Sequence, residues 1–264
     1  MPNYYVENAD AWKALSNIDY FTYFVKAWIP FNAWYRNNYP ALDSDGVIMQ
    51  QIKTHHNSFR NRIISLIENP ETDNNSKIFK MYLGELHHQL ERNHIHKRGE
   101  RISFTNIVVE DNPQLTQTRI YRRFEYKVEI DTGNRKNIVS SVIDGSSVSR
   151  LNVNQNSGYN LDEILNDAQY RALPPECQRL LKACYEEVNP KKAIGLLTVD
   201  TSNSIKMGNY HFINDSELIA KALITVIYYL RNSLFHGQLV PDKNTHLVYE
   251  PAYHILRMLV MSLS

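Results

Sequence analysis

The sequence predicts a mainly α fold, a helical bundle that carries a small antiparallel β insertion. Apolar residues recur at helical spacing in the first third of the chain and again near its end. Between about residues 101 and 150 the pattern changes to β-branched and aromatic runs, which are typical of strands. The chain of 264 residues can bury a substantial core. We therefore expect a single helical domain over residues 1–264, with the β-rich insertion at about 101–150.

The first third of the chain predicts three helices. An aromatic-rich helix is expected from Ala9 to Arg36, with a break near Pro30. A second helix is expected from Asp45 to Glu68 and a third from Ser76 to His94. The polar loop of residues 69–75 separates the last two helices.

The expected insertion contains three or so strands. β-branched and aromatic residues fill the runs 102–109, 120–130 and 138–143. Turn-forming residues follow the second and third runs, at 131–134 and 144–145.

Helices are expected to return after the insertion. The periodicity predicts them from Leu161 to Tyr170 and from Pro174 to Val188, then a long one from Asn214 to His236, and a last one from about Tyr253 to Leu263.

The long helix that ends at His236 is expected in the centre of the bundle. Asn214 is predicted to cap its N-terminus, with Glu217 in capping-box position. Its segment 218–227 has only two polar residues, so the helix is apolar nearly all round. Gly237 is expected to stop it, which places His236 in the last turn among unpaired carbonyls.

Composition and cysteine use indicate a cytoplasmic protein. The net charge of +1 gives no global attraction to nucleic acid, so any RNA contact has to rest on local basic clusters. Cys177 and Cys184 are expected about two turns apart on one helix, too far for an unstrained disulfide, and a reducing compartment fits them best. Residues 1–5 lack the start of a signal peptide, and no stretch is expected to reach the length of a membrane span.

The most informative motif lies at residues 231–236. Arg231 is followed by the polar Asn232, and His236 comes four residues after Asn232. Histidine can transfer protons near neutral pH, and a guanidinium offers forked donors that match phosphate oxygens. Because RNA carries its own nucleophile, the 2′-hydroxyl, these groups need neither a metal nor a cofactor to cleave it. The alternative is an arginine that extends to solvent and a histidine that caps the helix.

This motif resembles the R-(polar)-x3-H signature of the HEPN ribonucleases, and the aromatic segment 28–36 resembles the first helix of some bacterial HEPN proteins. The resemblance covers the two ends of the chain and says little about its middle. It implies a HEPN-like antiparallel helical bundle with Arg231, Asn232 and His236 as catalytic residues. It also implies a metal-independent endoribonuclease that leaves a cyclic phosphate and a 5′-hydroxyl. The implied setting is toxin–antitoxin or antiviral defence, with an antitoxin or defence protein as partner.

The spacing within the motif predicts a site shared by two chains. Arg231 and His236 are five residues apart, roughly 140° around an ideal helix, so one copy aims them poorly at one phosphate. A distorted last turn or a two-fold dimer would bring them together. We expect a homodimer with a composite site.

Two basic clusters predict where RNA would bind. Both lie at or within the insertion, and the second alternates basic residues with aromatic ones, which suits contact with an RNA backbone. The RNA-binding candidates are Lys97, Arg98, Arg119, Arg122 and Arg123. The alternative is a solvated strand face with paired charges, for which Glu125 and Glu129 are available.

Four nearby histidines raise the question of a metal. The spacing of His87, His88, His94 and His96 matches no zinc pattern, so we expect no metal site there. His246 and His254 follow the motif, and packing roles are expected for both.

The sequence is therefore compatible with two classes of function. The first is a HEPN-type endoribonuclease. The second is a non-catalytic HEPN helical module that dimerises and binds a partner protein or a nucleotide. A pure scaffold has no chemical reason to keep Arg231, Asn232 and His236 together, and this favours the ribonuclease.

Overall fold

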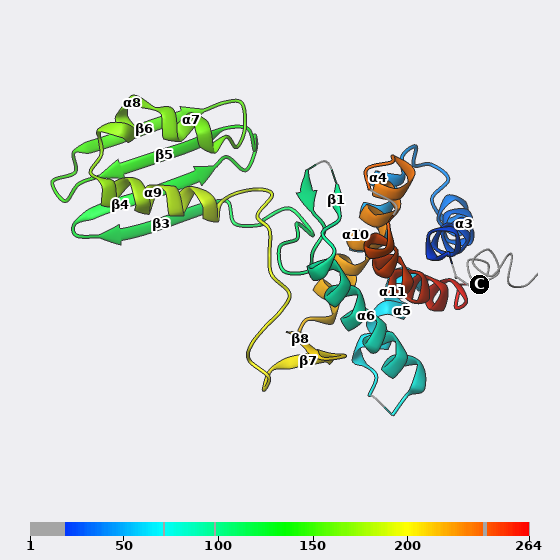
Figure 1. Cartoon of the computed structure of the whole chain (residues 1–264). Coiled ribbons are helices and arrows are strands. Elements are labelled where there is room, and N and C mark those ends of the chain that lie inside the picture. Colours follow the sequence, from blue (N-terminus) through cyan, green and yellow to red (C-terminus); the bar gives the residue numbers. More distant parts are fainter. Residues whose placement is uncertain (1–18, 71, 98, 240–241, 264) are drawn as a thin grey trace, which may run out of the picture. The chain divides into compact units, whose positions relative to one another are not determined.

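The computed structural model describes residues 19–70, 72–97, 99–239 and 242–263. The chain forms two compact units (Figure 1). The helical unit contains the chain up to Val109 and from Gly195 onward, and the inserted unit is Glu110–Ile194. The inserted unit is thus longer than the insertion expected at about 101–150, because it includes the helices that follow the strands.

The helical unit is built from six described helices and two short β-hairpins. The helices are α3 (Tyr20–Asn38), α4 (Asp45–Thr54), α5 (Ser58–Glu68), α6 (Asn74–Arg92), α10 (Ser216–Phe235) and α11 (Lys243–Val260). The hairpins pair β1 (His96–Lys97) with β2 (Glu100–Arg101) and β7 (Ser204–Met207) with β8 (Tyr210–Ile213). Helix α10 contacts α4, α5, α11 and β1, so it is the central helix that the sequence predicts.

The expected helix from Asp45 to Glu68 is split into α4 and α5. Asn57 causes the break, because its side-chain oxygen accepts the Arg60 N–H and caps α5. Its amide also donates to the carbonyls of Ile52 and His55 at the end of α4. One asparagine therefore satisfies the ends of two helices.

Helix α3 is continuous through Pro30, where a break was predicted. Pro30 and Lys26, whose carbonyl loses its helical donor, both occupy exposed positions, so water can replace the missing bond. The predicted portion before residue 19 lies outside the described residues.

Two other helix boundaries also differ from the predicted ones. Asp215 caps α10 in place of Asn214, because its carboxylate accepts the Leu218 N–H at 2.8 Å. Helix α11 begins at Lys243, well before the predicted Tyr253, because Asp242 forms a capping box ahead of it.

The inserted unit is a four-stranded antiparallel sheet with helices on one face. The order of the strands in the sheet is β3 (Thr116–Tyr121), β4 (Phe124–Ile130), β5 (Ile138–Ile143) and β6 (Ser149–Gln155). The helices are α7 (Leu161–Asn166), α8 (Ala168–Ala172) and α9 (Pro175–Glu187). The predicted run 102–109 is mostly irregular and belongs to the helical unit, whereas β6 was not predicted.

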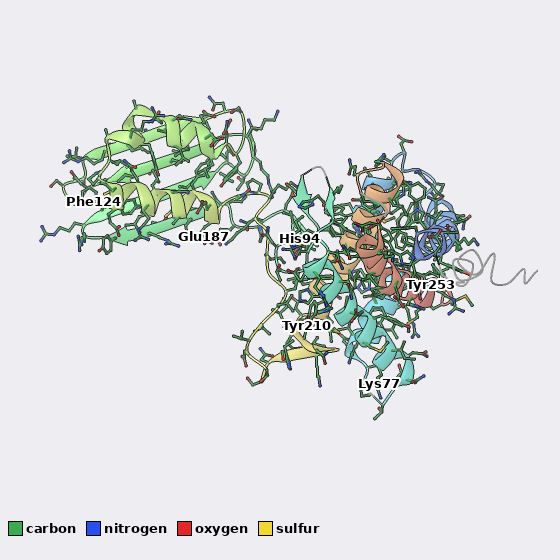
Figure 2. All side chains as sticks on the ribbon, viewed as in Figure 1. Lys77, His94, Phe124, Glu187, Tyr210 and Tyr253 are labelled. Carbon is green, nitrogen blue, oxygen red and sulfur yellow. The ribbon has the colours of Figure 1, made fainter. Side chains whose placement is uncertain are left out.

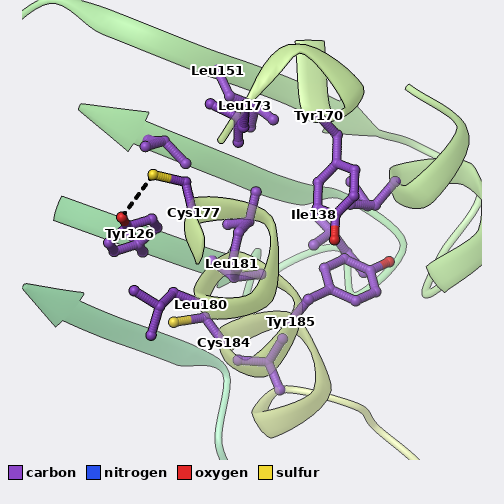
Figure 3. Packing of buried hydrophobic residues seen from close by; sticks show 14 of the residues in the cluster. Tyr126, Ile138, Leu151, Tyr170, Leu173, Cys177, Leu180, Leu181, Cys184 and Tyr185 are labelled. Carbon is purple, nitrogen blue, oxygen red and sulfur yellow. Dashed lines mark hydrogen bonds between the residues drawn. The ribbon is translucent and has the colours of Figure 1, made fainter. Parts of the chain in front are cut away.

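The inserted unit has its own hydrophobic core between the sheet and α9 (Figure 3). Leu181 and the two cysteines of α9 are buried against strand residues that include Tyr126 and Ile138. The hydroxyl of Tyr126 donates to the sulfur of Cys177 at 3.2 Å. Cys177 and Cys184 are free thiols on the buried side of one helix, as the sequence predicts.

Among the described helices, α10 alone is long and apolar enough to cross a membrane. The expectation that no stretch reaches this length was therefore wrong. The apolar window of α10 is 61% buried within the structure. A buried core helix meets the same criteria of length and composition, so α10 by itself does not indicate a membrane span.

Candidate functional site

The three motif residues lie at the C-terminal end of α10, as the sequence predicts. The His236 N–H donates to the Asn232 carbonyl, and Gly237 has a positive φ of 62° that ends the helix. The three side chains differ in exposure: Asn232 is 7% exposed, the Arg231 side chain is 19% exposed, and His236 lies at an exposed position.

The guanidinium of Arg231 is held by groups from three helices. One terminal nitrogen lies 3.4 Å from a carboxylate oxygen of Asp45 at the start of α4. The other donates to the side-chain oxygen of Asn232 at 2.9 Å. The planar group also lies over two rings, 4.6 Å from the centre of Phe235 and 5.7 Å from the centre of Trp28 on α3. The position of Arg231 is therefore defined by tertiary contacts.

Asp45 joins Arg231 to a second arginine. Its other carboxylate oxygen accepts from Arg36 at the end of α3. The hydroxyl of Tyr35 also bonds to Asp45, and burial, followed by the charge of Asp45, raises the pKa of Tyr35 to about 12. The amide of Asn32 donates to the Tyr35 oxygen. Two guanidinium cations and one carboxylate leave this cluster with one net positive charge.

The two segments that carry the sequence resemblance meet at this cluster. Trp28, Tyr35 and Arg36 come from the aromatic segment 28–36, and Arg231 comes from the motif. The Trp28 ring also stacks against Tyr228, one turn before Arg231 on α10, with a centre distance of 6.4 Å. Segments almost two hundred residues apart in sequence thus form one polar cluster with an aromatic wall.

His236 is not part of this cluster. Its imidazole makes no hydrogen bond, ion pair or ring contact within the parts of the chain that the structure describes. Arg231 is directed at α3 and α4, while His236 caps the helix at an exposed position. In one copy of the chain, His236 therefore lies outside the network of contacts that holds Arg231.

Lys97 is the basic candidate that lies beside the motif helix. It belongs to β1, and its ammonium nitrogen lies 3.4 Å from the centre of the Tyr229 ring on α10. The hairpin is tied to the same helix by Ser233, whose hydroxyl donates to the His96 carbonyl at 3.1 Å. Arg98 lies outside the described residues.

The other three RNA-binding candidates lie in the inserted unit. Arg122 and Arg123 form the two-residue turn between β3 and β4, with φ values of 47° and 70°. Asparagine and glycine are the usual residues in such turns, because they tolerate a positive φ. For most other residues a positive φ costs about 1–3 kcal/mol. Arg122 also lies 5.1 Å from the Tyr121 ring centre. Arg119 is on β3 itself, two residues before Tyr121.

The histidines take separate packing roles. His87 is buried, and burial lowers its pKa. His88 bonds to the hydroxyl of Tyr210 on β8 at 2.6 Å, while His94 contacts the Glu91 carbonyl at the end of α6. Tyr210 and His94 are labelled in Figure 2. Within the described residues no group of three or more histidines, cysteines and carboxylates can hold a metal ion.

His246 and His254 both pack against neighbouring helices. The ring nitrogen of His246 accepts the Tyr20 N–H at the start of α3. His254 stacks on Tyr82 of α6 at 4.4 Å, and burial lowers its pKa. The packing roles expected for these two histidines are thus observed.

Three members of the Arg231 cluster were missed from the sequence: Asn32, Arg36 and Asp45. Asn32 and Arg36 belong to the segment whose aromatic character was noted, but no role was assigned to their polar side chains. Asp45 follows Ser44 at the start of α4, and this pattern indicates only a helix start. These three residues come together with Arg231 only in the folded structure, and no spacing pattern along the chain predicts that they do.

Comparisons of the chain with protein-family models, with curated proteins and with solved structures gave no match.

The burial of Arg231 predicts a stability difference between the motif residues. Arg231→Ala should lower the free energy of unfolding by about 1–3 kcal/mol, because it leaves Asp45 and Asn232 short of a partner. His236→Ala should change it by less than about 0.5 kcal/mol, because the imidazole is exposed. Urea titration followed by tryptophan fluorescence measures this in the helical unit, since all three tryptophans precede residue 110. Equal destabilisation by both variants would contradict the different burial of the two side chains.

Proposed function

We propose that this chain is a metal-independent endoribonuclease of the HEPN type, acting as a toxin or antiviral defence effector in the cytoplasm. The observation that carries the proposal is the cluster in which Arg231 of the motif meets Trp28, Tyr35 and Arg36 of the aromatic first helix. Both segments that resemble HEPN proteins contribute to it. We also propose that the helical unit is a HEPN-like antiparallel bundle.

The chemistry assigns one role to each motif residue. His236 removes the proton from the 2′-hydroxyl or delivers one to the departing 5′-oxygen, and its exposed position gives RNA access to it. Arg231 binds the phosphate, which gains negative charge as the 2′-oxygen attacks. The attack closes a cyclic phosphate and releases a 5′-hydroxyl. Asn232 is a positioning residue, because its side-chain oxygen accepts from Arg231.

A second copy of the chain completes this site in the proposal. Arg231 faces α3 and α4, while His236 stands outside the cluster at the helix end. A two-fold axis near that end would place the histidine of each copy by the arginine of the other. Phe235, which is 49% exposed directly before His236, is an apolar group suited to such a contact.

The second candidate function is a non-catalytic module of the same fold that dimerises and binds a partner protein or a nucleotide. One observation favours it: Arg231 is already engaged by Asp45, Asn232 and two rings, as expected of an arginine that holds helices together. The exposed His236 has no comparable structural contact, so it is the residue that separates the two functions.

Loss of His236 should nearly abolish cleavage, and cleavage by the wild type should need no metal. His236→Ala should lower the rate by about 10²- to 10⁴-fold, the usual contribution of a proton-transfer group. Arg231→Lys keeps a charge beside Asp45, but an ammonium group cannot make the forked contact with phosphate. This variant should therefore also cleave RNA slowly. The measurement is cleavage of total RNA in excess chelator, with end-group analysis of the products. Wild-type cleavage by His236→Ala would leave the non-catalytic module as the function.

The shared site predicts a dimer in solution. Light scattering at micromolar concentration should give twice the mass of the chain, and Phe235→Asp should reduce it to the mass of one chain, because a charge cannot be buried at the contact. Met261→Asp is the matched control, since Met261 is 75% exposed at the end of another helix. A fully active monomer would rule out the composite site.

The arginines of the inserted unit should contribute to RNA binding through phosphates. Replacing Arg119, Arg122 and Arg123 with glutamine should lower the slope of log affinity against log salt by about 0.7 for each phosphate of single-stranded RNA that is no longer bound. Replacing Arg135 and Arg150, which belong to the same unit but pair with Asp111 and Asp144, is the control. An unchanged slope in the first variant would assign its arginines to structure alone.

A further inference from the structure

Strand β3 forms one edge of the sheet in the inserted unit (Figure 1). The Ile130 N–H donates to the Leu115 carbonyl, so these two residues are a hydrogen-bonded pair, and so is every second pair along β3 and β4. The residues between them direct their N–H and C=O groups away from β4, toward the open edge. These outward residues are Thr116, Thr118 and Ile120.

Most of the outward backbone groups have no hydrogen-bond partner within the residues that the structure describes. The Thr116 carbonyl accepts from the side-chain amide of Gln114 at 3.0 Å. The outward N–H and C=O groups of Thr118 and Ile120 make no hydrogen bond in the described part of the chain. All three side chains are exposed, and Ile120 is 76% exposed. The edge thus presents unpaired backbone donors and acceptors beside a large apolar side chain.

The opposite edge of the same sheet is protected. Strand β6 has a register shift against β5 at Val142 and Ile143, and the Asn152 N–H donates to the side-chain oxygen of Gln169 at 2.9 Å. Bulges and covering groups are usual means by which proteins prevent an edge strand from pairing with another chain. Strand β3 pairs with β4 without a shift, and its six residues include neither proline nor lysine. One edge is therefore closed to pairing, and the other is open to it.

The sequence of β3 is complementary to a second copy of itself. An antiparallel pair centred on Thr118 would place this residue opposite the same residue of the second copy, and Thr116 opposite Ile120. All three outward residues would then exchange hydrogen bonds with outward residues of the other strand. Pairs of threonines are among the favourable cross-strand pairs, and the threonine methyl at 116 would cover part of the exposed isoleucine. This register uses every outward group of the strand.

Charge favours the same register. Arg119 is the only charged residue of β3, and in this register it lies opposite Gln117, whose amide oxygen can accept from it. A pair centred on Arg119 would place two arginines opposite each other, which is destabilising. A pair centred on Gln117 would place Ile120 beyond the end of the other strand. Arg119 also has a counter-charge on its own chain: the hydrogen bond from Lys192, and then the charges of Lys192 and Arg119, lower the pKa of Glu187 on α9.

We propose that β3 pairs with β3 of a second copy of the chain, antiparallel and centred on Thr118, so that the two sheets become one continuous sheet. The contact belongs to the inserted unit, involves no part of α10 and does not depend on the ribonuclease function. One short strand buries less than the roughly 1,200 Å² of a stable interface, so the pairing forms only well above micromolar concentration. At micromolar concentration the mass is decided by the contact proposed at the end of α10.

The test is disulfide cross-linking of full-length variants with one added cysteine, at submillimolar concentration. Thr118→Cys should form a covalent dimer, because the Cα atoms of a hydrogen-bonded antiparallel pair lie about 5.5 Å apart, within reach of a disulfide. Thr116→Cys should not, because its two copies would lie roughly 13 Å apart along the strands. Asn154→Cys is the matched control, an exposed residue of the protected edge. The native Cys177 and Cys184 are buried, so the wild type should give no cross-link.

A second measurement is light scattering of Phe235→Asp, which removes the contact proposed at α10. Its mass should rise from that of one chain at micromolar concentration to that of two chains at submillimolar concentration. Adding Thr118→Lys should abolish this twofold rise, because a lysine on an edge strand opposes pairing, whereas adding Asn154→Lys should not. Unchanged thermal unfolding of both double variants shows that folding is not the cause.

The outcomes separate this contact from the dimer proposed at α10. Equal cross-linking of all three cysteine variants indicates random collision and overturns the pairing, and so does cross-linking of none. A Thr118→Cys cross-link that Phe235→Asp abolishes belongs to the α10 dimer and overturns an independent contact at β3. Cross-linking of Thr118→Cys to a different protein overturns the second copy as the occupant of the edge. A monomeric wild type at micromolar concentration overturns the α10 dimer alone, and a cross-link specific to Thr118→Cys in that protein supports the pairing.

Discussion

The carboxylate of Asp45 is the contact on which the candidate site depends. It lies in the first turn of α4 and pairs with Arg36 of α3 and Arg231 of α10, so three helices meet at one acidic group. A half-buried guanidinium without an anion would be costly, because burial disfavours the charged form and arginine does not release its proton. The pairing with Asp45 therefore limits where the motif arginine can lie. The geometry of the motif is a property of the helical unit, and one helix alone does not define it.

The same contact sets the electrostatics of the site. Two guanidinium groups that share one carboxylate repel each other, and the carboxylate between them offsets this repulsion. One positive charge remains on the cluster, and the Arg36 side chain is 43% exposed, so an incoming phosphate would meet a cation that solvent already reaches. In the proposed ribonuclease, loss of Asp45 would strengthen the attraction of the cluster for phosphate but would hold Arg231 less firmly. In the proposed site, Asp45 would thus weaken the binding of phosphate while it fixes the orientation of Arg231.

Helical periodicity predicted the core of the fold because α10 and α6 carry long apolar patterns with clear ends. It failed where one polar side chain decides a boundary, as at Asn57 and Asp242, or where proline lies inside a helix, as at Pro30. The catalytic candidates were found because chemistry and spacing coincide in the motif. The role of Asp45 was not predicted, because its partners Arg36 and Arg231 come from segments far apart along the chain and only packing brings them together.

The motif and the proposed dimer are linked by the five-residue spacing between Arg231 and His236. Arg231 faces α3 and α4, and His236 ends the helix at an exposed position. A strand with a phosphate at Arg231 would reach the histidine of the same copy only on another side of the helix. The proposed second copy supplies a histidine from the opposite direction, so the strand need not bend around the helix end.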